Sequence, residues 1–531
     1  MRPVNKLMYK QRLIVSLFWW LLVGLILGFM ASMKYVALHT ALMDFGIFLF
    51  HFRNIEQGEW AWALSFGHIQ PFNLFYSFIY SQLPVNFAPQ IVLIIQGLLL
   101  ASPIYWLRQQ YGSVVMIAYI LYFPLWFIAL FDFHIDHLSI VFTAFFFILV
   151  KNHKGLAIVS AIALALVKEP FALQTTMCGV YILGVHWRNS HNIISKDLFS
   201  FENIKIYLYS IGLIVFGLFY FYIAIDNLLP LASGDKSVAY SSAAFSWMGT
   251  SISEIVRYII THPIDIFLEI ISNSNKVIYL VAIFGSLGFI PLLKPGPLIV
   301  ALPILAIALL SRHEGYYGLG HHYTAGLIAP IIFAFIGGLP RAEMIWQRVG
   351  FSVKWFYALL VIVLLAAHIA LSPSPISRLF WSDKIWSYNY KAYIPADRDL
   401  MIKQAIVDYI PTEPDITISI QNTLNWAPLV QRRHFLLFPE GVVKGQQVPF
   451  FSKSLWASEV EWRTIMADYV VLDMKRPWFL IDKGCDWLYG KCTNVRMTNE
   501  YLEWVEKTKS IMQVVFERDG FIILKRKNNG E

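Results

Sequence analysis

Four groups of ionisable residues stand beside long apolar segments of this chain, and together they could form one polar site. The first group follows an uncharged apolar segment, residues 13–32, and the others lie at the ends of later segments. The groups are Asp44, His51, Arg53 and His68; Asp132, His134, Asp136 and His137; Lys168 and Glu169; and Arg312, His313, Glu314, His321, His322 and Tyr323. Ionisable side chains at membrane depth are costly and usually line a polar cavity or pathway. If all four groups lie at one membrane face, they indicate a site.

The first group belongs to a stretch, residues 40–73, that mixes acids and bases with Phe and Trp. It is too polar for a membrane span and too aromatic for a free aqueous loop. We interpret it as short amphipathic helices at the membrane surface, within a first outer loop of about residues 33–87, with Asp44 pointing into a cavity. Alternatively, Asp44 caps a surface helix and the aromatic residues lie among the lipid headgroups.

The segment 131–137, FDFHIDH, contains residue types that bind divalent cations. In an extended conformation Asp132, His134 and Asp136 would share one face, and in a helix Asp132 and Asp136 would lie one turn apart. Either geometry could hold a metal ion, with Mg²⁺ or Mn²⁺ as the candidate cofactor. A helix end at which acids and imidazoles meet water would explain the same residues without a metal.

Two further segments have residues that suit a phosphate. Lys168 and Glu169 precede a proline at the end of an apolar segment, where Lys168 could contact a lipid phosphate or pair with a neighbouring helix. The segment 311–323, SRHEGYYGLGHHY, combines glycines that let the backbone approach a ligand with an arginine and three histidines. Its tyrosines could equally belong to the membrane interface. The candidate substrate- or phosphate-binding residues are Arg53, His68, Lys168, Glu169, Arg312, His313, His321, His322 and Tyr323.

The composition is that of a polytopic membrane protein. Of the 531 residues, 57% are hydrophobic and only 14% are charged, whereas about 25% of a soluble domain is charged. The formal net charge of +8 does not indicate a nucleic-acid partner, because the bases lie in short loops between apolar segments and set the topology. The first apolar segment has no small-residue cleavage site, so we interpret it as a retained span rather than a signal peptide.

About eleven transmembrane helices are predicted. Their approximate ranges are 13–32, 88–107, 113–131, 137–150, 155–168, 171–187, 204–225, 275–292, 296–311, 323–339 and 355–371. The bases of the N-terminal tail place it in the cytoplasm, and alternation then places all four ionisable groups on the outer face of the cytoplasmic membrane. The segment 253–270 has apolar residues at helical spacing and is predicted as an interfacial helix that breaks at Pro263.

The composition changes at residue 372, where SPSPIS begins a linker. We therefore divide the chain into a transmembrane domain, residues 1–371, and a small soluble extracytoplasmic α/β domain, residues 372–531. Strand-like segments are 416–420, 469–473 and 521–526, and a helical segment is 399–410.

This second domain has no glycine-rich phosphate loop, which favours a role as a lid or in acceptor docking. Cys485 and Cys492 could form a disulfide or stay as two thiols.

Several motifs resemble an uncharacterised family of bacterial and archaeal predicted membrane proteins, known as a domain of unknown function. The motifs are DFGIF at 44–48, FGHIQP at 66–71, LFDFHIDHLSI at 130–140, LVKEPFAL at 166–173, HHYTA at 321–325, ISIQNTLNWAPLVQRR at 418–433 and ADYVVLD at 467–473. An acid just after the first span, a first outer loop of interfacial helices and a soluble outer domain also look like the glycosyltransferase-C superfamily, by analogy of fold.

This resemblance implies transfer of a sugar, with inversion, from a polyprenyl-phosphate donor in the lipid bilayer to an extracytoplasmic acceptor: a glycan, a lipid or a protein. Asp44 matches the position of a general base that deprotonates the acceptor. The resemblance also implies roles for residues that would stabilise the leaving phosphate, and for residues that would hold a metal or orient the sugar. The first set is Lys168, Arg312, His321 and His322, and the second is Asp132, His134 and Asp136. The chain lacks the Asp-x-Asp motif that some superfamily members have in the first loop.

Two other functions are compatible with the composition. A transporter or flippase for a lipid-linked glycan would also need charges within the bundle, but usually on both sides of the midplane and with repeat symmetry. Here the charges are predicted on one side, and no repeat is visible. A non-catalytic membrane assembly protein would use its outer domain for binding, and it would keep its partner after the change Asp44→Asn.

Overall fold

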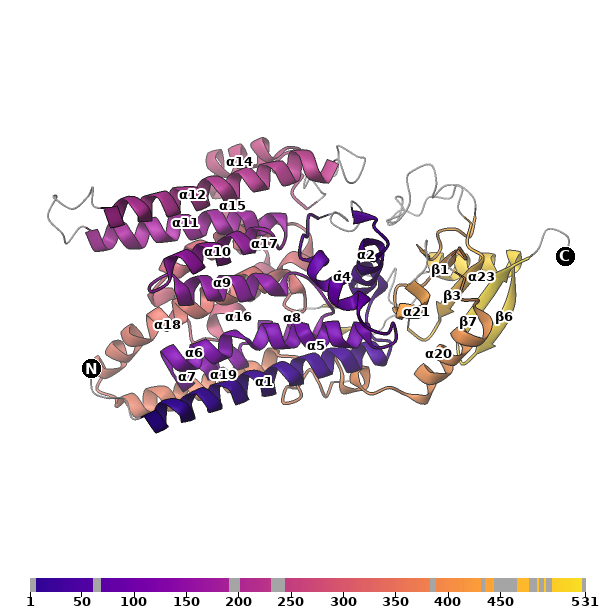
Figure 1. Ribbon diagram of the computed structural model, residues 1–531, viewed down its shortest axis with the longest axis horizontal. Coiled ribbons are helices and arrows are strands. Elements are labelled where there is room, and N and C mark those ends of the chain that lie inside the picture. Colours follow the sequence, from indigo (N-terminus) through magenta and orange to yellow (C-terminus); the bar gives the residue numbers. More distant parts are fainter. Residues whose placement is uncertain are drawn as a thin grey trace.

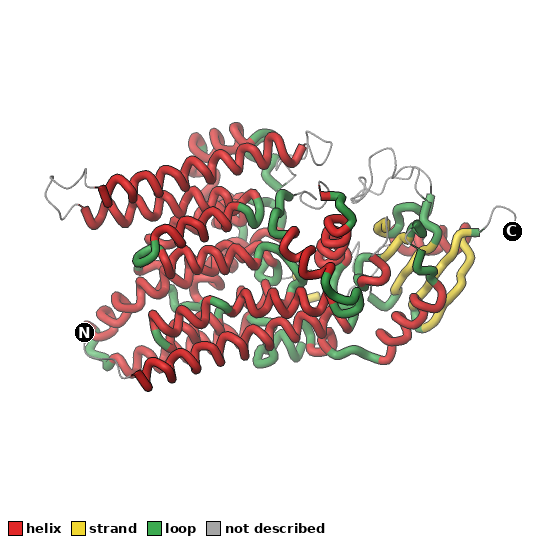
Figure 2. Tube along the Cα trace, viewed as in Figure 1, coloured by secondary structure: helices red, strands yellow, loops and turns green. Residues whose placement is uncertain are grey.

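Long helices lie side by side in a bundle, and a small sheet caps one end of it (Figures 1 and 2). This computed structural model describes residues 6–60, 68–190, 201–230, 244–382, 388–413, 415–430, 435–443, 466–476, 485–486, 491–492 and 499–527. Helix α1 (Lys6–Val36) begins at the end opposite the sheet and runs towards it (Figure 1). The sheet end therefore holds the segments that follow α1.

The helices of the bundle vary widely in length. Those before the long central loop are α5 (Ala88–Ala101), α6 (Pro103–Tyr111), α7 (Ser113–Leu121), α8 (Phe123–Leu130), α9 (His137–Leu149), α10 (Lys154–Ala165), α11 (Glu169–Ser190), α12 (Phe201–Ile223) and the π-helix η2 (Ala224–Leu228). Those after it are α14 (Ile252–Thr261), α15 (Pro263–Ser272), α16 (Ser274–Gly285), the 3₁₀ helices η3 (Ile290–Leu293) and η4 (Gly296–Ala301), α17 (Leu302–Leu310), α18 (Ala325–Arg348) and α19 (Val353–Leu371).

Five helices in the described part of the chain are long and apolar enough to cross a membrane. They are Gln11–Val36, Ala88–Tyr111, Asn203–Leu228, His322–Arg348 and Val353–Leu371. Two bent pairs raise the number to seven if each is one span: α7 with α8, at 50°, and α15 with α16, at 83°. The 13 residues of α9 reach only about 20 Å, less than the hydrocarbon thickness of about 30 Å. The structure thus shows five to seven candidate spans, and the larger number of eleven is not confirmed.

Close backbone contact holds α1 against α5. A Cβ added at Gly28 would lie 2.6 Å from the Cα of Ile94, and one added at Gly97 would meet the backbone of Gly28. Small residues allow this approach, which is common between membrane helices. The contact fixes the C-terminal end of α1 beside the loop that follows α8.

The segment predicted as the first outer loop contains short helices, as expected. They are the π-helix η1 (Leu42–Gly46), α2 (Ile47–Glu56) and α4 (Asn73–Ser81), while residues 61–67 lie outside the described part. The predicted interfacial helix also forms, and it breaks at Pro263 into α14 and α15. Ile260, Ile264 and Phe267 on this pair are each at least 60% exposed. An apolar exposed face of this kind fits a helix at the membrane interface.

The C-terminal sheet has five strands in the order β2-β1-β3-β7-β6. They are β1 (Ile418–Ile420), β2 (Phe435–Leu437), β3 (Tyr469–Asp473), β6 (Met512–Arg518) and β7 (Phe521–Arg526). β1 is parallel to β2 and β3, and β7 is antiparallel to β3 and β6. The predicted strands correspond to β1, β3 and β7, so these are confirmed, and the sequence analysis missed β2 and β6.

Three helices and a short hairpin accompany this sheet. The helices are α20 (Asp397–Tyr409), which confirms the predicted one, α21 (Ala427–Val430) and α23 (Asn499–Ile511). The hairpin of β4 (Cys485–Asp486) and β5 (Lys491–Cys492) places Cys485 opposite Cys492. A disulfide between them stays a prediction.

The segment after α19 packs against the bundle instead of forming a loose linker. Ser374 is buried, and its hydroxyl lies 2.7 Å from Nε2 of His368. Further along, Tyr388 donates a hydrogen bond of 2.6 Å to the carbonyl of Gly320, just before the 3₁₀ helix η7 (Tyr390–Tyr393). One continuous apolar core includes side chains of α1, α5 and α18 together with those of β1 and β3. The sheet therefore packs against the end of the bundle that carries Asp44.

Candidate functional site

The structure brings together residues from all four predicted groups at the sheet end of the bundle. Asp44 lies on the π-helix η1, and His134 and Asp136 lie in the loop between α8 and α9. Lys168 directly precedes α11, and His322 opens the 3₁₀ helix η6 (His322–Thr324) before α18. These five side chains form one continuous cluster, which we call the polar cluster.

Within the polar cluster, Asp44 contacts His134, and His134 contacts His322. Nε2 of His134 lies 3.2 Å from Oδ1 of Asp44. The imidazole rings of His134 and His322 stack with centroids 3.6 Å apart and planes at 12°. The Asp44 side chain is 17% exposed, so its carboxylate is reachable from outside while His134 fixes its position.

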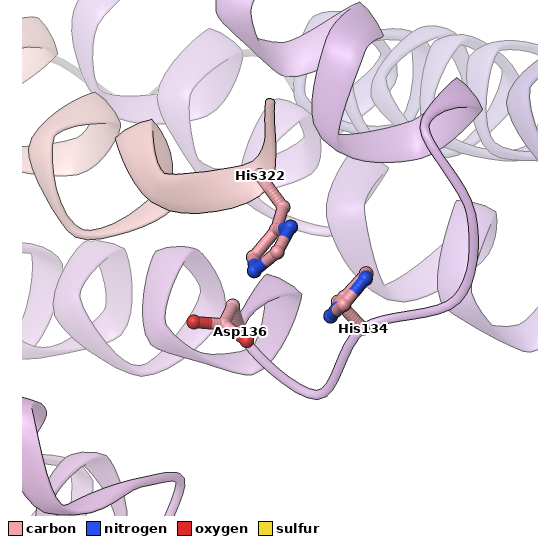
Figure 3. Close-up of side chains that lie close together, drawn as sticks. All are labelled: His134, Asp136 and His322. Carbon is pink, nitrogen blue, oxygen red and sulfur yellow. The ribbon is translucent and has the colours of Figure 1, made fainter. Parts of the chain in front are cut away.

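Asp136 lies close to the imidazoles of His134 and His322 (Figure 3). One ligand atom each from His134, Asp136 and His322 lies within 4.8 Å of the other two. The ammonium group of Lys168 lies 3.7 Å from Oδ1 of Asp136, and both side chains are less than 10% exposed. The three residues are of the types that hold a metal ion, and Lys168 supplies a buried positive charge beside them.

The loop that carries His134 is held by buried polar contacts. Asp132 accepts hydrogen bonds from Lys34 at 3.1 Å and from the amide of Ala41 at 2.7 Å. His137 donates through Nδ1 to the carbonyl of His134, at 2.6 Å, and accepts through Nε2 from Tyr76, at 2.6 Å. This loop is neither an extended strand nor a helix, so Asp132 points to Lys34 and away from the metal-ligand set predicted for it. In the candidate set, His322 takes the place of Asp132.

A pocket of about 60 Å³ opens beside the polar cluster. Its polar wall consists of His68, Asp136, Lys168, Tyr316 and Tyr323, and its apolar wall of Pro170, Phe171, Ile304, Ile307 and Ala308. This volume holds a few water molecules or a small polar group. The pocket thus joins a charged wall to an apolar one at the end of the bundle.

The carboxylate of Glu169 is paired with other groups and does not line this pocket. Its Oε1 lies 2.5 Å from Nδ1 of His68, and its Oε2 accepts from the amide of Ile69 at 3.1 Å. The Glu169 side chain is fully buried, whereas that of His68 is 34% exposed. Glu169 therefore positions His68 at the pocket.

Two predicted bases lie apart from the polar cluster. Arg312 pairs with Glu269 on α15, at 3.3 Å, and its guanidinium lies 4.9 Å from the ring centroid of Trp247. Arg53 is buried on α2 and has Glu56 and Glu59 as its charged neighbours. In the described part of the chain, each guanidinium thus has acidic neighbours outside the polar cluster.

The remaining predicted residues lie near the polar cluster without joining it. His313 accepts a hydrogen bond from the amide of Gly315, at 3.2 Å, in the 3₁₀ helix η5 (Glu314–Tyr317). The ring of His321 lies 5.4 Å from that of Phe131. Burial lowers the pKa of His321 to about 4, so this imidazole is neutral at neutral pH. Tyr323 lies against His322, with ring centroids 4.2 Å apart.

The sequence analysis missed three residues that build this site. Lys34, which binds Asp132, comes just after the first apolar segment, and Gln96 contacts the amide of His134, at 3.4 Å, from within another. A polar residue in an apolar segment is the signal that could have found both. The third is Asn422, which follows β1. Its backbone carbonyl accepts from the amide of Leu42 and its side-chain oxygen from the amide of Met43, both at 2.7 Å.

We expect Asn422→Ala to loosen the π-helix that carries Asp44. The change removes the acceptor of the Met43 amide, and an unpaired buried donor costs about 1–3 kcal/mol. Hydrogen exchange followed by mass spectrometry should show faster exchange over residues 42–46, with a lower unfolding temperature. Asn422→Asp keeps the acceptor and is the matched control. Unchanged exchange in Asn422→Ala would show that the sheet does not hold Asp44 in place.

Comparison with known protein families identifies the family of this chain. A family described as "Predicted membrane protein (DUF2079)" matches residues 34–462. The chain belongs to this family. The matched region begins at Lys34, contains the whole polar cluster and extends into the C-terminal sheet. No curated protein matches the chain. Family membership and the apolar helices together show a membrane protein in contact with a lipid bilayer.

Proposed function

We propose that this protein is a membrane glycosyltransferase that moves a sugar from a polyprenyl-phosphate donor to an acceptor at the outer face of the cytoplasmic membrane. The observation that carries this proposal is the polar cluster itself. Asp44, His134, His322, Asp136 and Lys168 come from distant parts of the chain and contact one another in sequence. They end at a pocket whose opposite wall is apolar.

Asp44 has the position and surroundings of a general base. Its carboxylate is partly exposed and hydrogen-bonded to His134, which holds it in one orientation. In the proposed reaction, the acceptor hydroxyl gives its proton to Asp44 and its oxygen forms a bond to the anomeric carbon. The bond from that carbon to the phosphate oxygen breaks on the opposite face, and the phosphate leaves with the electron pair. General-base catalysis of this kind contributes about 10²- to 10⁴-fold to a rate.

The pocket offers separate surfaces to the two ends of the donor. Lys168 and His68 line its polar wall, where they would face the phosphate. Phe171 and Ile304 line the apolar wall, along which the isoprenoid chain would leave the pocket. A fixed positive charge in a buried site stabilises the charge that develops on a leaving phosphate.

The proposed topology follows from the two ends of α1. Its N-terminal end follows the basic tail, which favours the cytoplasm. The opposite end points towards the sheet (Figure 1) and leads into η1, which carries Asp44. In the proposed topology, the sheet and the pocket therefore lie on the outer face. Because the sheet contacts η1 through Asn422, we assign it to acceptor docking or to control of access.

A lipid analysis tests the proposal. Cells that lack this chain should accumulate a polyprenyl-phosphate sugar, measured by mass spectrometry of membrane extracts. Wild-type protein and Asp265→Asn, a change of an exposed acid on α15, should both restore the normal level. Equal donor levels in cells with and without the chain would overturn the proposal, and would leave transport or assembly as the function to test.

A further inference from the structure

Three side chains of the polar cluster converge with a spacing that suits one metal ion. The candidate ligand atoms of His134, Asp136 and His322 lie within 4.8 Å of one another. An ion bound at about 2.1 Å from each nitrogen and oxygen requires ligand atoms no more than about 4.2 Å apart. Small side-chain movements of less than about 1 Å would therefore close the three ligands around one ion. Asp136 and His322 are buried, and His134 is partly buried.

Two atoms of this group lack the hydrogen bonds that burial demands. Oδ2 of Asp136 and Nδ1 of His322 are both buried and have no hydrogen-bond partner among the described residues. Asp136 is 4% exposed and His322 is 5% exposed. Buried polar atoms are paired in the great majority of cases, so each exception needs an explanation. An ion would supply a partner for the Asp136 carboxylate and the His322 imidazole together.

The contact between Asp44 and His134 has the form found around metal-binding histidines. Nε2 of His134 donates to Oδ1 of Asp44, at 3.2 Å, so Nδ1 carries the lone pair that an ion needs. Metal-binding histidines usually give their other N–H to a carboxylate, which fixes the tautomer and the ring orientation. Asp44 would thus hold His134 ready for the ion.

The charges of the polar cluster also favour a bound cation. The side chains around the cluster include two carboxylates, Asp44 and Asp136, but only one ammonium group within 4 Å of them, that of Lys168, among the described residues. With neutral imidazoles, these side chains carry one more negative charge than positive charge, which favours a bound cation. A divalent ion reverses the sign, because a bound cation is usually the largest local charge in a site.

We propose that His134, Asp136 and His322 bind one divalent transition-metal ion of the Mn²⁺, Co²⁺ or Zn²⁺ class. Two imidazoles and one carboxylate suit these ions, whereas Mg²⁺ and Ca²⁺ prefer oxygen ligands alone. Of the cofactors expected from the sequence, this donor set favours Mn²⁺ over Mg²⁺. The role of the ion, which is to place positive charge beside the donor phosphate, rests on the proposed function, but the binding site itself does not.

Metal binding by the purified, full-length protein tests this inference. Chelator-treated protein in detergent should bind one Co²⁺, seen by visible absorption, and one Mn²⁺, seen as loss of the free-ion electron paramagnetic resonance signal. His322→Ala and Asp136→Asn should weaken Mn²⁺ binding by at least 10-fold. His262→Ala, which changes an exposed histidine before α15, is the matched control and should bind as wild type. Equimolar Mg²⁺ should not compete.

Thermal unfolding keeps the test valid if one variant folds poorly. Mn²⁺ should raise the unfolding temperature of the wild type and of His262→Ala, because an ion that binds only the folded state stabilises it. It should not raise that of folded His322→Ala or Asp136→Asn. Stoichiometric binding that survives both changes, or no binding by the wild type, would overturn the inference. Sugar transfer by metal-free protein would refute the metal's role and leave the proposed function standing. Metal binding without any sugar transfer would refute the proposed function and leave the metal site standing.

Discussion

Asp44→Asn is expected to lower the rate of sugar transfer by about 10²- to 10⁴-fold, the usual contribution of a general base. Asparagine has nearly the same shape as aspartate, and its side-chain oxygen can still accept the hydrogen bond from Nε2 of His134. It cannot accept a proton from the acceptor hydroxyl. The geometry of η1 should therefore survive, while the proton transfer is lost.

The measurement is conversion of a labelled polyprenyl-phosphate sugar to polyprenyl phosphate by purified protein, with a membrane extract as the acceptor source. Asp44→Asn should lower kcat and leave the KM for the donor nearly unchanged, since Asp44 does not line the donor pocket. Asp265→Asn is the matched control on an exposed acid. A folded Asp44→Asn protein that transfers at the wild-type rate would contradict the role of base.

Asp44 also orients His134, so the same change could act through a bound ion. The two effects separate in the metal titration. A lost base leaves the Mn²⁺ affinity close to that of the wild type, whereas a lost orienting carboxylate weakens it by about 10- to 100-fold. Added Mn²⁺ would then restore transfer in the second case but not in the first.

The sequence predicted the helical segments well, whereas the predicted number of spans is not confirmed, and proline explains part of the difference. The apolar segment 113–131 looks continuous, but Tyr122 has an extended backbone with ψ of 106°. It stands two residues before Pro124, and Phe123, which directly precedes that proline, begins the next helix. Proline disfavours continuation of a helix through the preceding turn. The mean hydropathy of such a segment depends on its composition alone, so it does not reveal the bend.

Burial and length explain which strands of the sheet could be predicted from the sequence. β3 is buried throughout and reads as an unbroken apolar segment, YVVLD, so it was predicted. β6 lies at the edge of the sheet, and most of its residues are exposed or half-buried, so MQVVFER gives a weak signal. β2 has only three residues, too few for a periodic pattern to show.

The site was predicted as a set of segments on one side of the membrane, and its pairings were not predictable from them. Asp44 and His134 are 90 positions apart, and Met43 and Asn422 are 379 apart. Hydropathy and charge patterns carry no information about which of these side chains meet. The candidate metal-ligand set is an example, because His322 takes the place predicted for Asp132 once the loop conformation directs Asp132 towards Lys34.

Lys34→Met is expected to destabilise the folded protein by about 3–5 kcal/mol, the usual cost of removing one partner of a buried ion pair. Lys34 and Asp132 lie 3.1 Å apart, and both side chains are 5% exposed or less. Lys34 also donates to the carbonyls of Leu130 and Phe131. Without Lys34, the Asp132 carboxylate stays buried next to the loop that carries His134, and the Ala41 amide is its one remaining donor among the described residues. Unfolding by SDS in mixed micelles measures the loss.

The loss should depend on pH in a defined direction. Burial raises the pKa of Asp132 to about 7, and Lys34 opposes that rise, so removal of Lys34 raises this pKa further above the unfolded value. A group with a raised pKa in the folded state loses stability as the pH rises. Lys34→Met should therefore be least destabilised near pH 5 and most destabilised near pH 8.

Two variants decide whether the ion pair is the cause. The double change Lys34→Met with Asp132→Asn removes both charges together, and it should recover most of the stability that the single change loses. Lys354→Met changes an exposed lysine at the start of α19 and should leave the free energy of unfolding unchanged. If Lys34→Met is as stable as Lys354→Met at both pH values, the pair does not hold the loop. The position of His134 would then depend on Gln96 and His137 alone, because these are the other described side chains that contact its backbone.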